Sequence, residues 1–174
     1  TKRLPTNLVT HQELCAHLQG RTHVTTIDLS DAFFQIPLAL SAQPLTAFYS
    51  ASHGKRYCFQ RCPQGLKNSP LHLKLMMDKM FGDMANDVIH YADDIMIATN
   101  GNFATHLKAV NKVLQRIVTG NIKIRPQKIN LNRESIEFLG MIWTKGQLSI
   151  PEAKLLAFKN LSLIHISEPT RQAE

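Results

Sequence analysis

The sequence is poor in cysteine. Its 174 residues include three, Cys15, Cys58 and Cys62, which make no closed disulfide framework and fit a reducing compartment. Cys58 and Cys62 together with His53 offer three of the four ligands that a structural zinc site needs. The cysteine content therefore argues against both a disulfide-stabilised fold and structural zinc.

Long apolar runs, internal repeats and low-complexity segments are also missing. No stretch has the length of a membrane span and no signal peptide opens the chain, so we expect an intracellular protein without a membrane partner. The hydrophobic fraction of 44% and the length suit one folded domain with a real core. The net charge of +7 favours a polyanionic partner such as nucleic acid.

Two adjacent carboxylates, Asp93 and Asp94, lie between two apolar, β-prone runs at residues 88–89 and 95–97. This pattern predicts a β-hairpin with the acids at its tip. Adjacent acids repel each other, and their apolar neighbours make desolvation costly unless a cation compensates the charge. Taken alone, the stretch leaves open an ordinary turn in which Asp bonds to nearby backbone.

A second acidic stretch of similar design lies upstream. A β-branched run leads into Asp28, and Asp31 follows three residues later on a predicted turn of helix. If Asp28 at its strand end faces Asp93 and Asp94 across a sheet, the three carboxylates hold one or two hard divalent cations, because Mg²⁺ prefers oxygen ligands. Such metal pairs stabilise the attacking and leaving oxygens of a phosphoryl displacement. The sequence therefore predicts metal-assisted phosphoryl chemistry.

Two long helices are predicted. The first has Ser69 as N-cap and Pro70 at its first position, and runs to about Met84. The second is capped by Asn102, ends at Gly120 and covers the back of the sheet. Helical spacing assigns Leu71, Leu75, Met76, Met80 and Met84 to the buried face of the first helix, and Phe103, Leu107, Val110, Leu114 and Ile117 to that of the second.

Shorter elements complete an α+β pattern. A helix capped by Thr10 is closed by Gly20, and a last helix opens at Pro151. The tail at 161–174 resembles translated sequencing adapter, and we expect it to be non-native. Strands are expected at about 22–28, 45–49, 56–60, 122–124, 128–131, 136–143 and 148–150.

Five motifs in order resemble those of reverse transcriptases. Residues 27–34 are similar to the first polymerase motif, 63–70 to the second and 91–94 to the third, while Lys128 falls at the lysine of the fourth and 138–140 at the fifth. The Pro-Gln-Gly form of the second motif is most similar to retroviral enzymes and those of LTR retroelements. A lone Tyr-Ala-Asp-Asp is a weak signal, whereas five spaced motifs are a specific one.

The resemblance implies a polymerase palm, built on an antiparallel sheet that carries the acids with two helices packed on one face. A reverse transcriptase domain would span 1–160, with palm at 1–35 and 66–160, partial fingers at 36–65 and a C-terminal primer-grip hairpin. Strand order comes from the resemblance and not from local pattern. The remaining fingers strands would lie before Thr1, and thumb and RNase H domains would follow, so we expect this fragment alone to polymerise poorly.

The resemblance also implies site roles. Asp28 and Asp93 would hold two Mg²⁺ ions, with Mn²⁺ as a substitute, and Asp94 would complete the cluster. Asp31 and Ala32 would offer backbone N–H groups to the triphosphate, as a helical turn does for anions. For Asp31 alone, a simple helix cap is the alternative.

Further residues of the matching motifs would contact the nucleotide and the primer. Phe33 would be the steric gate against a 2′-hydroxyl, with a core aromatic as the alternative. Gln64 and Gly65 would lie over the incoming nucleotide. Lys128 would lie near the triphosphate and protonate the leaving pyrophosphate, with a solvated lysine as the alternative. The primer grip would be formed by Phe138, Leu139 and Gly140.

The implied function is an RNA-directed DNA polymerase core of a retrovirus-like Pol polyprotein, working in the cytoplasm or within a virus-like particle. Its partners would be an RNA or DNA template, a DNA or tRNA primer, deoxynucleoside triphosphates and the rest of the polyprotein. An inactive or domesticated nucleic-acid-binding remnant is the alternative. A two-metal nuclease ranks lower, because it leaves Phe33 and the Pro-Gln-Gly loop without a role.

Overall fold

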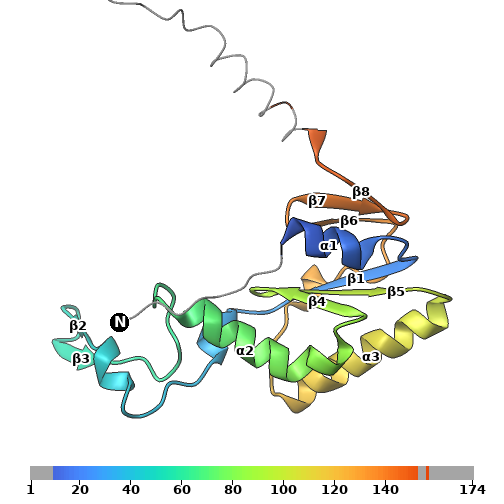
Figure 1. The fold of residues 1–174 in the computed structure, drawn as a ribbon. Coiled ribbons are helices and arrows are strands. Elements are labelled where there is room, and N and C mark those ends of the chain that lie inside the picture. The colour runs from blue at the N-terminus through green and yellow to red at the C-terminus, as the bar shows by residue number, and fades with distance from the viewer. Residues whose placement is uncertain (1–9, 153–155, 157–174) are drawn as a thin grey trace, which may run out of the picture.

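The structure is a computed structural model that describes residues 10–152 and residue 156 (Figure 1). The expected tail at 161–174 lies outside the described residues, as does most of the helix expected from Pro151. None of the helices in the described part of the chain is long and apolar enough to span a membrane.

A three-stranded antiparallel sheet forms the centre of the fold. It consists of β1 (His23–Asp28), β4 (Val88–Tyr91) and β5 (Asp94–Thr99) in the order β1-β5-β4. β4 and β5 are the two arms of the predicted acidic hairpin. Residues 95–99 of β5 are all buried, because successive side chains of this central strand enter the cores on both faces of the sheet.

Two helices, α2 (Ser69–Phe81) and α3 (Phe103–Thr119), pack against one face of this sheet (Figure 1). A short 3₁₀ turn, η3 (Gly82–Met84), extends α2. This confirms the predicted architecture of two helices on one face. The main buried side chains of this core are Ile27, Leu29, Leu73, Met77, Phe81, Ile95, Ile97, Val110, Val113 and Ile117.

The face that α2 buries agrees with the predicted one only in part. As predicted, Met84 is buried and Met76 and Met80 pack against the core. Leu73, Met77 and Phe81 also enter the core, whereas Leu75 remains 54% exposed and Leu71 is half-buried. Apolar residues occur on several sides of this helix. Their spacing alone therefore does not show that the face with Phe81, the bulkiest of them, is the one that packs into the core. Ser69 was also wrong as N-cap: it is the first helical residue, and its hydroxyl lies 2.8 Å from the Sγ of buried Cys62.

The boundaries of α3 agree with the prediction. Asn102 Oδ1 accepts a hydrogen bond of 2.9 Å from the N–H of Thr105, which caps the helix. Val110 and Ile117 are buried and Leu114 packs against the core, as predicted. Phe103 and Leu107 stay exposed, however, and polar His106 is fully buried. The imidazole of His106 lies 2.7 Å from the hydroxyl of Thr25 and 2.9 Å from that of Thr99, so both ring nitrogens have partners on the sheet.

The opposite face of the sheet is covered by α1 (His11–Leu18) and a meander of β6 (Ser135–Phe138), β7 (Met141–Thr144) and β8 (Gln147–Ser149). The Thr10 cap is confirmed, with a reciprocal capping box to Glu13. The single strand expected at 136–143 is instead two strands, because Leu139 and Gly140 make a tight turn with φ values of 50° and 71°.

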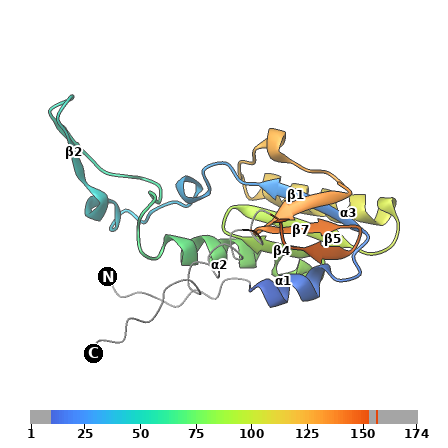
Figure 2. The same cartoon turned by 90° about the horizontal axis from the view of Figure 1, so that it is seen from above.

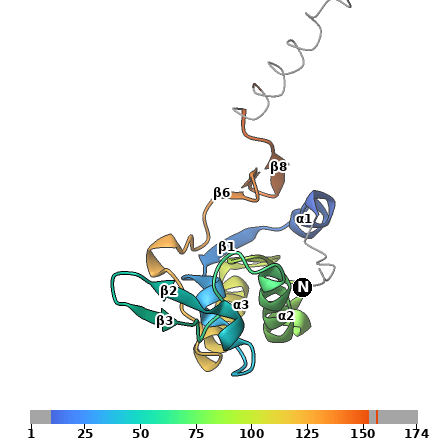
Figure 3. The same ribbon diagram turned by 90° about the vertical axis from the view of Figure 1, so that its left-hand side faces the viewer.

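Residues 36–65 extend away from the sheet as an arm (Figures 1 and 2). The strand expected at 45–49 begins later, because the 3₁₀ turn η2 (Gln43–Thr46) precedes β2 (Phe48–Ser50). Among the described residues, β2 pairs with β3 (Lys55–Tyr57) and with no other strand, and Figure 3 shows this pair from the side. The strands expected at 122–124 and 128–131 do not form. Each segment instead makes one isolated bridge to β1 or to the residue just after it, Ile124 with Leu29 and Asn130 with Thr26. The turn η4 (Pro126–Lys128) lies between the two segments.

The buried His106 predicts a pH-dependent stability. Burial, and secondarily the charge of His23, lowers the pKa of His106 from 6.5 to about 4. The unfolded chain therefore takes up this proton at a higher pH than the folded chain does. The contribution of neutral His106 to stability is fully present above pH 6.5 and is lost as the pH falls towards 4. We expect the free energy of unfolding to drop by about 2 kcal/mol between pH 7 and pH 5 on account of His106. Urea denaturation at the two pH values measures this.

The matched variants are His106→Gln and His72→Gln, the second at an exposed position on α2. His106→Gln should flatten the pH dependence, although His17 and His90, whose pKa values are also lowered by burial, keep their share. His72→Gln should retain the full slope. An unchanged slope in His106→Gln would contradict the assignment.

Candidate active site

Strand pairing brings two of the predicted acids together. β1 and β5 pair with Asp28 directly opposite Asp94, so the two side chains project from the same face of the sheet. The N–H of Leu29 donates a hydrogen bond of 2.8 Å to the carbonyl of Asp93, which fixes the hairpin tip against the end of β1. Ala92 in the tip has φ 51°, a conformation suited to a tight turn between twisted strands. The acids at 28, 93 and 94 thus share one end of the sheet.

The acids crowd around Asp94 closely enough to affect its pKa. Burial raises the pKa of Asp94, and the negative charges of Asp93 and Asp28 raise it further, while Lys128 acts in the opposite sense. A carboxylate held in this way has more negative charge around it than the protein compensates. Such a setting favours a bound cation.

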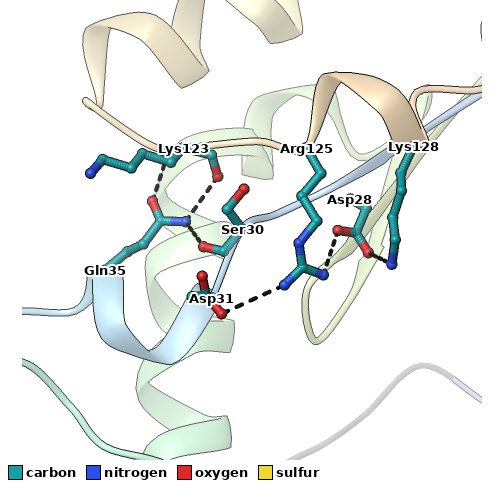
Figure 4. Close-up of polar contacts among 7 residues, drawn as sticks. All are labelled: Asp28, Ser30, Asp31, Gln35, Lys123, Arg125 and Lys128. Carbon is teal, nitrogen blue, oxygen red and sulfur yellow. Dashed lines mark hydrogen bonds and ion pairs between the residues drawn. The ribbon is translucent and has the colours of Figure 1, made fainter.

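Two cationic side chains contact the carboxylate of Asp28 (Figure 4). Arg125 Nη1 is 3.0 Å from Asp28 Oδ1, and Lys128 Nζ is 3.4 Å from Asp28 Oδ2. The Asp28 side chain is only 14% exposed. Lys128 therefore contacts the acid, and the alternative of a purely solvated lysine does not describe it. Arg125 was missed from the sequence, because nothing local links it to an acid 97 residues earlier.

The segment that carries Arg125 and Lys128 is fastened by main-chain contacts. The N–H of Arg125 donates to the carbonyl of Asp28 at 2.9 Å. The side-chain amide of Gln35 accepts from the N–H of Lys123 at 2.6 Å and donates to the Lys123 carbonyl at 2.9 Å, and it also donates to the carbonyl of Ser30 (Figure 4). Gln35 is thus a second residue that sequence reasoning missed, since its partner segment is 88 residues away.

The turn after β1 places the next predicted residues. Asp31 has φ 45° and makes no side-chain capping bond to the 3₁₀ turn η1 (Ala32–Gln35), so the simple helix cap was the wrong alternative. Arg125 Nη2 lies 3.6 Å from its carboxylate. Ala32 is buried in the core, and Phe33 packs partly against that core. Phe33 also lines a cavity of about 580 Å³, together with Tyr91 and Ala92 of the hairpin tip.

The predicted primer grip borders the acids. Phe138, Leu139 and Gly140 line a cavity of about 560 Å³ that also includes Asp28, Asp94 and Lys128 in its wall. Residues from four of the five motifs thus share one hollow. Gln64 and Gly65, by contrast, lie exposed in the loop before α2, and no contact in the described part of the chain joins them to the acids.

The donor set fits a divalent cation in chemistry and in backbone placement. Carboxylate oxygens from two adjacent strand ends are the ligands that Mg²⁺ prefers. As the side chains stand, no three His, Cys, Asp or Glu groups within residues 10–152 and 156 gather closely enough to hold a metal ion. Both oxygens of Asp28 are instead engaged by cations, one by Arg125 and the other by Lys128.

Comparison with known proteins assigns the family. A family model described as reverse transcriptase (RNA-dependent DNA polymerase) matches residues 2–143. The chain belongs to the reverse transcriptase family. That family consists of nucleotidyltransferases, and the match spans all five motifs.

The individual relatives are polyproteins. The chain is 33% identical over 147 residues to the retrovirus-related Pol polyprotein from transposon opus of Drosophila melanogaster, covering 84% of this chain and 14% of that protein. It is 35% identical over 138 residues to the Gag-Pro-Pol polyprotein of human T-cell leukemia virus 3 (strain 2026ND), covering 71% and 9%. This reverse transcriptase chain therefore spans a small part of its relatives' length.

Solved structures agree on the fold. A foamy viral protease-reverse transcriptase in complex with double-stranded DNA superposes with a TM-score of 0.78 at 24% identity, covering 91% of this chain and 27% of that one. Another, in complex with an RNA/DNA hybrid, gives 0.72 at 26% identity, covering 89% and 20%. These likenesses confirm the expected α+β architecture.

The uncompensated acids predict that loss of one of them stabilises the metal-free protein. Because the pKa of Asp94 is raised, its charged form at pH 7 opposes folding, and this cost vanishes as the pH falls and the group becomes protonated. Asp94→Asn should increase the free energy of unfolding at pH 7 by on the order of 1 kcal/mol, the strength of one charge pair a few ångströms apart in a solvent-like medium. Urea denaturation in the presence of a chelator measures it.

Asp83→Asn is the control of opposite sign. The Arg116 guanidinium, whose Nη2 lies 2.6 Å from Asp83, lowers the pKa of that carboxyl to about 2, so its charged form favours folding. Removing this charge should not stabilise the protein. A loss of stability in Asp94→Asn would refute the electrostatic interpretation of the site.

Proposed function

We propose that this chain is the catalytic core of an RNA-directed DNA polymerase, which adds deoxynucleotides to a primer 3′-hydroxyl as part of a retrovirus-like Pol polyprotein. The observation that carries the proposal is the pairing of Asp28 with Asp94 at the edge of the hollow formed by residues 138–140. A primer end held at that turn would lie beside the acids. Both features are needed for template-directed synthesis, and neither is needed for nucleic-acid binding alone.

Asp28, Asp93 and Asp94 would hold two Mg²⁺ ions, or Mn²⁺ in their place. The bound ions would supply Lewis acidity for the 3′-hydroxyl and charge neutralisation at the α-phosphate. The chain's own residues orient the reactants. The turn at Leu139 and Gly140 would grip the primer with Phe138 behind it. Phe138 shares a buried core with Met96 and Ala98 of β5, the strand that begins at Asp94, so packing holds the turn against the central sheet.

The nucleotide would lie over the turn that follows β1. Asp31 and Ala32 would present backbone N–H groups to its triphosphate, and Phe33 would lie beneath its sugar. Gln64 and Gly65 would approach from the loop before α2. Lys128 would protonate the leaving pyrophosphate, a role supported by its position 3.4 Å from Asp28 at the same hollow.

The remaining assignments follow from the same proposal. Residues 36–65 would be fingers, the rest of 1–160 palm, and 161–174 a non-native tail. The nucleic-acid partners would be an RNA or DNA template with a DNA or tRNA primer, inside the cell or a virus-like particle. The two solved relatives that are complexed with double-stranded DNA and with an RNA/DNA hybrid support this choice of partner.

The catalytic proposal predicts metal-dependent synthesis by the polyprotein that carries this chain. Primer extension on an RNA template should require Mg²⁺ or Mn²⁺, and Asp93→Asn should reduce it at least about 100-fold, since a lost metal ligand removes several kcal/mol of transition-state stabilisation. Glu134→Gln, which removes an exposed carboxylate on the approach to β6, should retain activity. A parent protein that binds primer-template but incorporates nothing would instead be an inactive remnant.

The steric gate predicts a change in sugar selection. Phe33→Val in the same parent should reduce the preference for deoxynucleotides over ribonucleotides about 10- to 100-fold, the range that shape discrimination provides. Single-nucleotide incorporation with matched dNTP and NTP pairs measures it. Phe34→Val is the control, because the ring of Phe34 is exposed and lies 6.2 Å from that of Phe59 in the arm. Equal effects at both positions would contradict the gate.

A further inference from the structure

Arg125 and Lys128 engage the same carboxylate that the proposed polymerase needs for its metal. Arg125 bonds one oxygen of Asp28 at 3.0 Å, and Lys128 contacts the other at 3.4 Å. Because the Asp28 side chain is 14% exposed, water screens these ion pairs less than it screens pairs on an open surface. An ion that binds Asp28 must therefore replace cations that are already there.

The guanidinium of Arg125 also reaches a second acid, which lies just beyond the first. Its Nη2 lies 3.6 Å from Asp31, so one planar group spans the two carboxylates that flank the turn after β1 (Figure 4). The backbone of the segment is held separately, through the Arg125 N–H on the Asp28 carbonyl and the Gln35 amide on Lys123. The side chain of Arg125 can therefore leave Asp28 without loss of the segment's position.

We propose that Arg125, assisted by Lys128, is a positioning residue that occupies the cation position on Asp28 in the metal-free protein and competes there with the divalent ion. The inference rests on the proposed function, since it presumes that Asp28 is a metal ligand. Arg125 keeps the acid compensated until the ion arrives. It then releases Asp28 while remaining within reach of Asp31.

Metal binding by the 174-residue chain tests this without any measurement of activity. Mn²⁺ binding is followed by the electron paramagnetic resonance signal of free Mn²⁺. Arg125→Gln should lower the dissociation constant for Mn²⁺ roughly three- to tenfold, the effect of one partly buried ion pair. Arg125→Lys, which keeps the charge but not the planar fork, should give a smaller change in the same direction.

Lys123→Gln is the matched control. It removes the same charge from the same segment, but the Lys123 side chain points away from the acids (Figure 4), and its contacts with Gln35 are made by the backbone. It should change the dissociation constant less than about twofold, as expected of a screened charge. If Lys123→Gln lowers the dissociation constant for Mn²⁺ as much as Arg125→Gln does, the effect comes from net charge alone and the proposal is overturned.

Thermal denaturation supplies a second readout and separates this proposal from the function on which it rests. Arg125→Gln should melt at a lower temperature than the wild type in chelator, and saturating Mn²⁺ should raise its melting temperature more than that of the wild type. Unchanged or weaker Mn²⁺ binding in Arg125→Gln would overturn the competition. If Asp94→Asn binds Mn²⁺ as tightly as the wild type does, the proposed metal site is wrong. If Asp94→Asn loses Mn²⁺ binding while Arg125→Gln binds Mn²⁺ as the wild type does, the polymerase proposal stands and the competition by Arg125 is overturned.

Discussion

The structure depends on a like-charge pair held together by apolar packing. Asp28 and Asp94 face each other across β1 and β5 because the register of these strands is set elsewhere, by Ile27 and Ile95 on the helical face and by Val24 and Ala98 on the other. A slip of one residue would turn every buried side chain of β1 to the wrong face. The hydrophobic cores thus enforce an arrangement that electrostatics opposes.

The remainder of the site compensates for this enforced repulsion. Arg125 and Lys128 neutralise Asp28, but Asp94 receives only partial relief, and its pKa remains raised. A site that keeps residual negative charge is prepared for a cation at some cost in stability, which is the usual relation between binding sites and the folds that carry them. The two cores, one on each face of β5, supply the stability that tolerates it.

Local sequence signals predicted most of the helices and strands. The acidic hairpin, the cap at Asn102 and the capping box at Thr10 depend on neighbouring residues, and all three agree with the structure. The structure brings motif residues Asp28, Lys128 and 138–140 together at one hollow. Local patterns failed where contacts with distant segments determine which side chains are buried. Spacing did not show that α2 buries Phe81. It also did not show that polar His106 is buried, where the hydroxyls of Thr25 and Thr99 are its partners.

Two other failures have a backbone origin. The run at 136–143 looks like one strand, because Leu139 is an unfavourable residue for positive φ and gives no turn signal except the glycine beside it. Arg125 and Gln35 were missed because their partners are 97 and 88 residues away, and one sequence carries no sign of such pairings. Both belong to the site, so its supporting contacts are less predictable than its motif residues.

The contacts of Arg125 and Lys128 set the charge balance at the end of the central sheet. Four acids, Asp28, Asp31, Asp93 and Asp94, share this end of the sheet with the cations Arg125 and Lys128, so their formal charges sum to −2, which is the charge that one divalent ion balances. Arrival of a triphosphate would add further negative charge and would require a second ion or the freed guanidinium. A segment that is fixed by its backbone but free in its side chains meets this changing requirement, because cations can move between partners while the sheet stays in register.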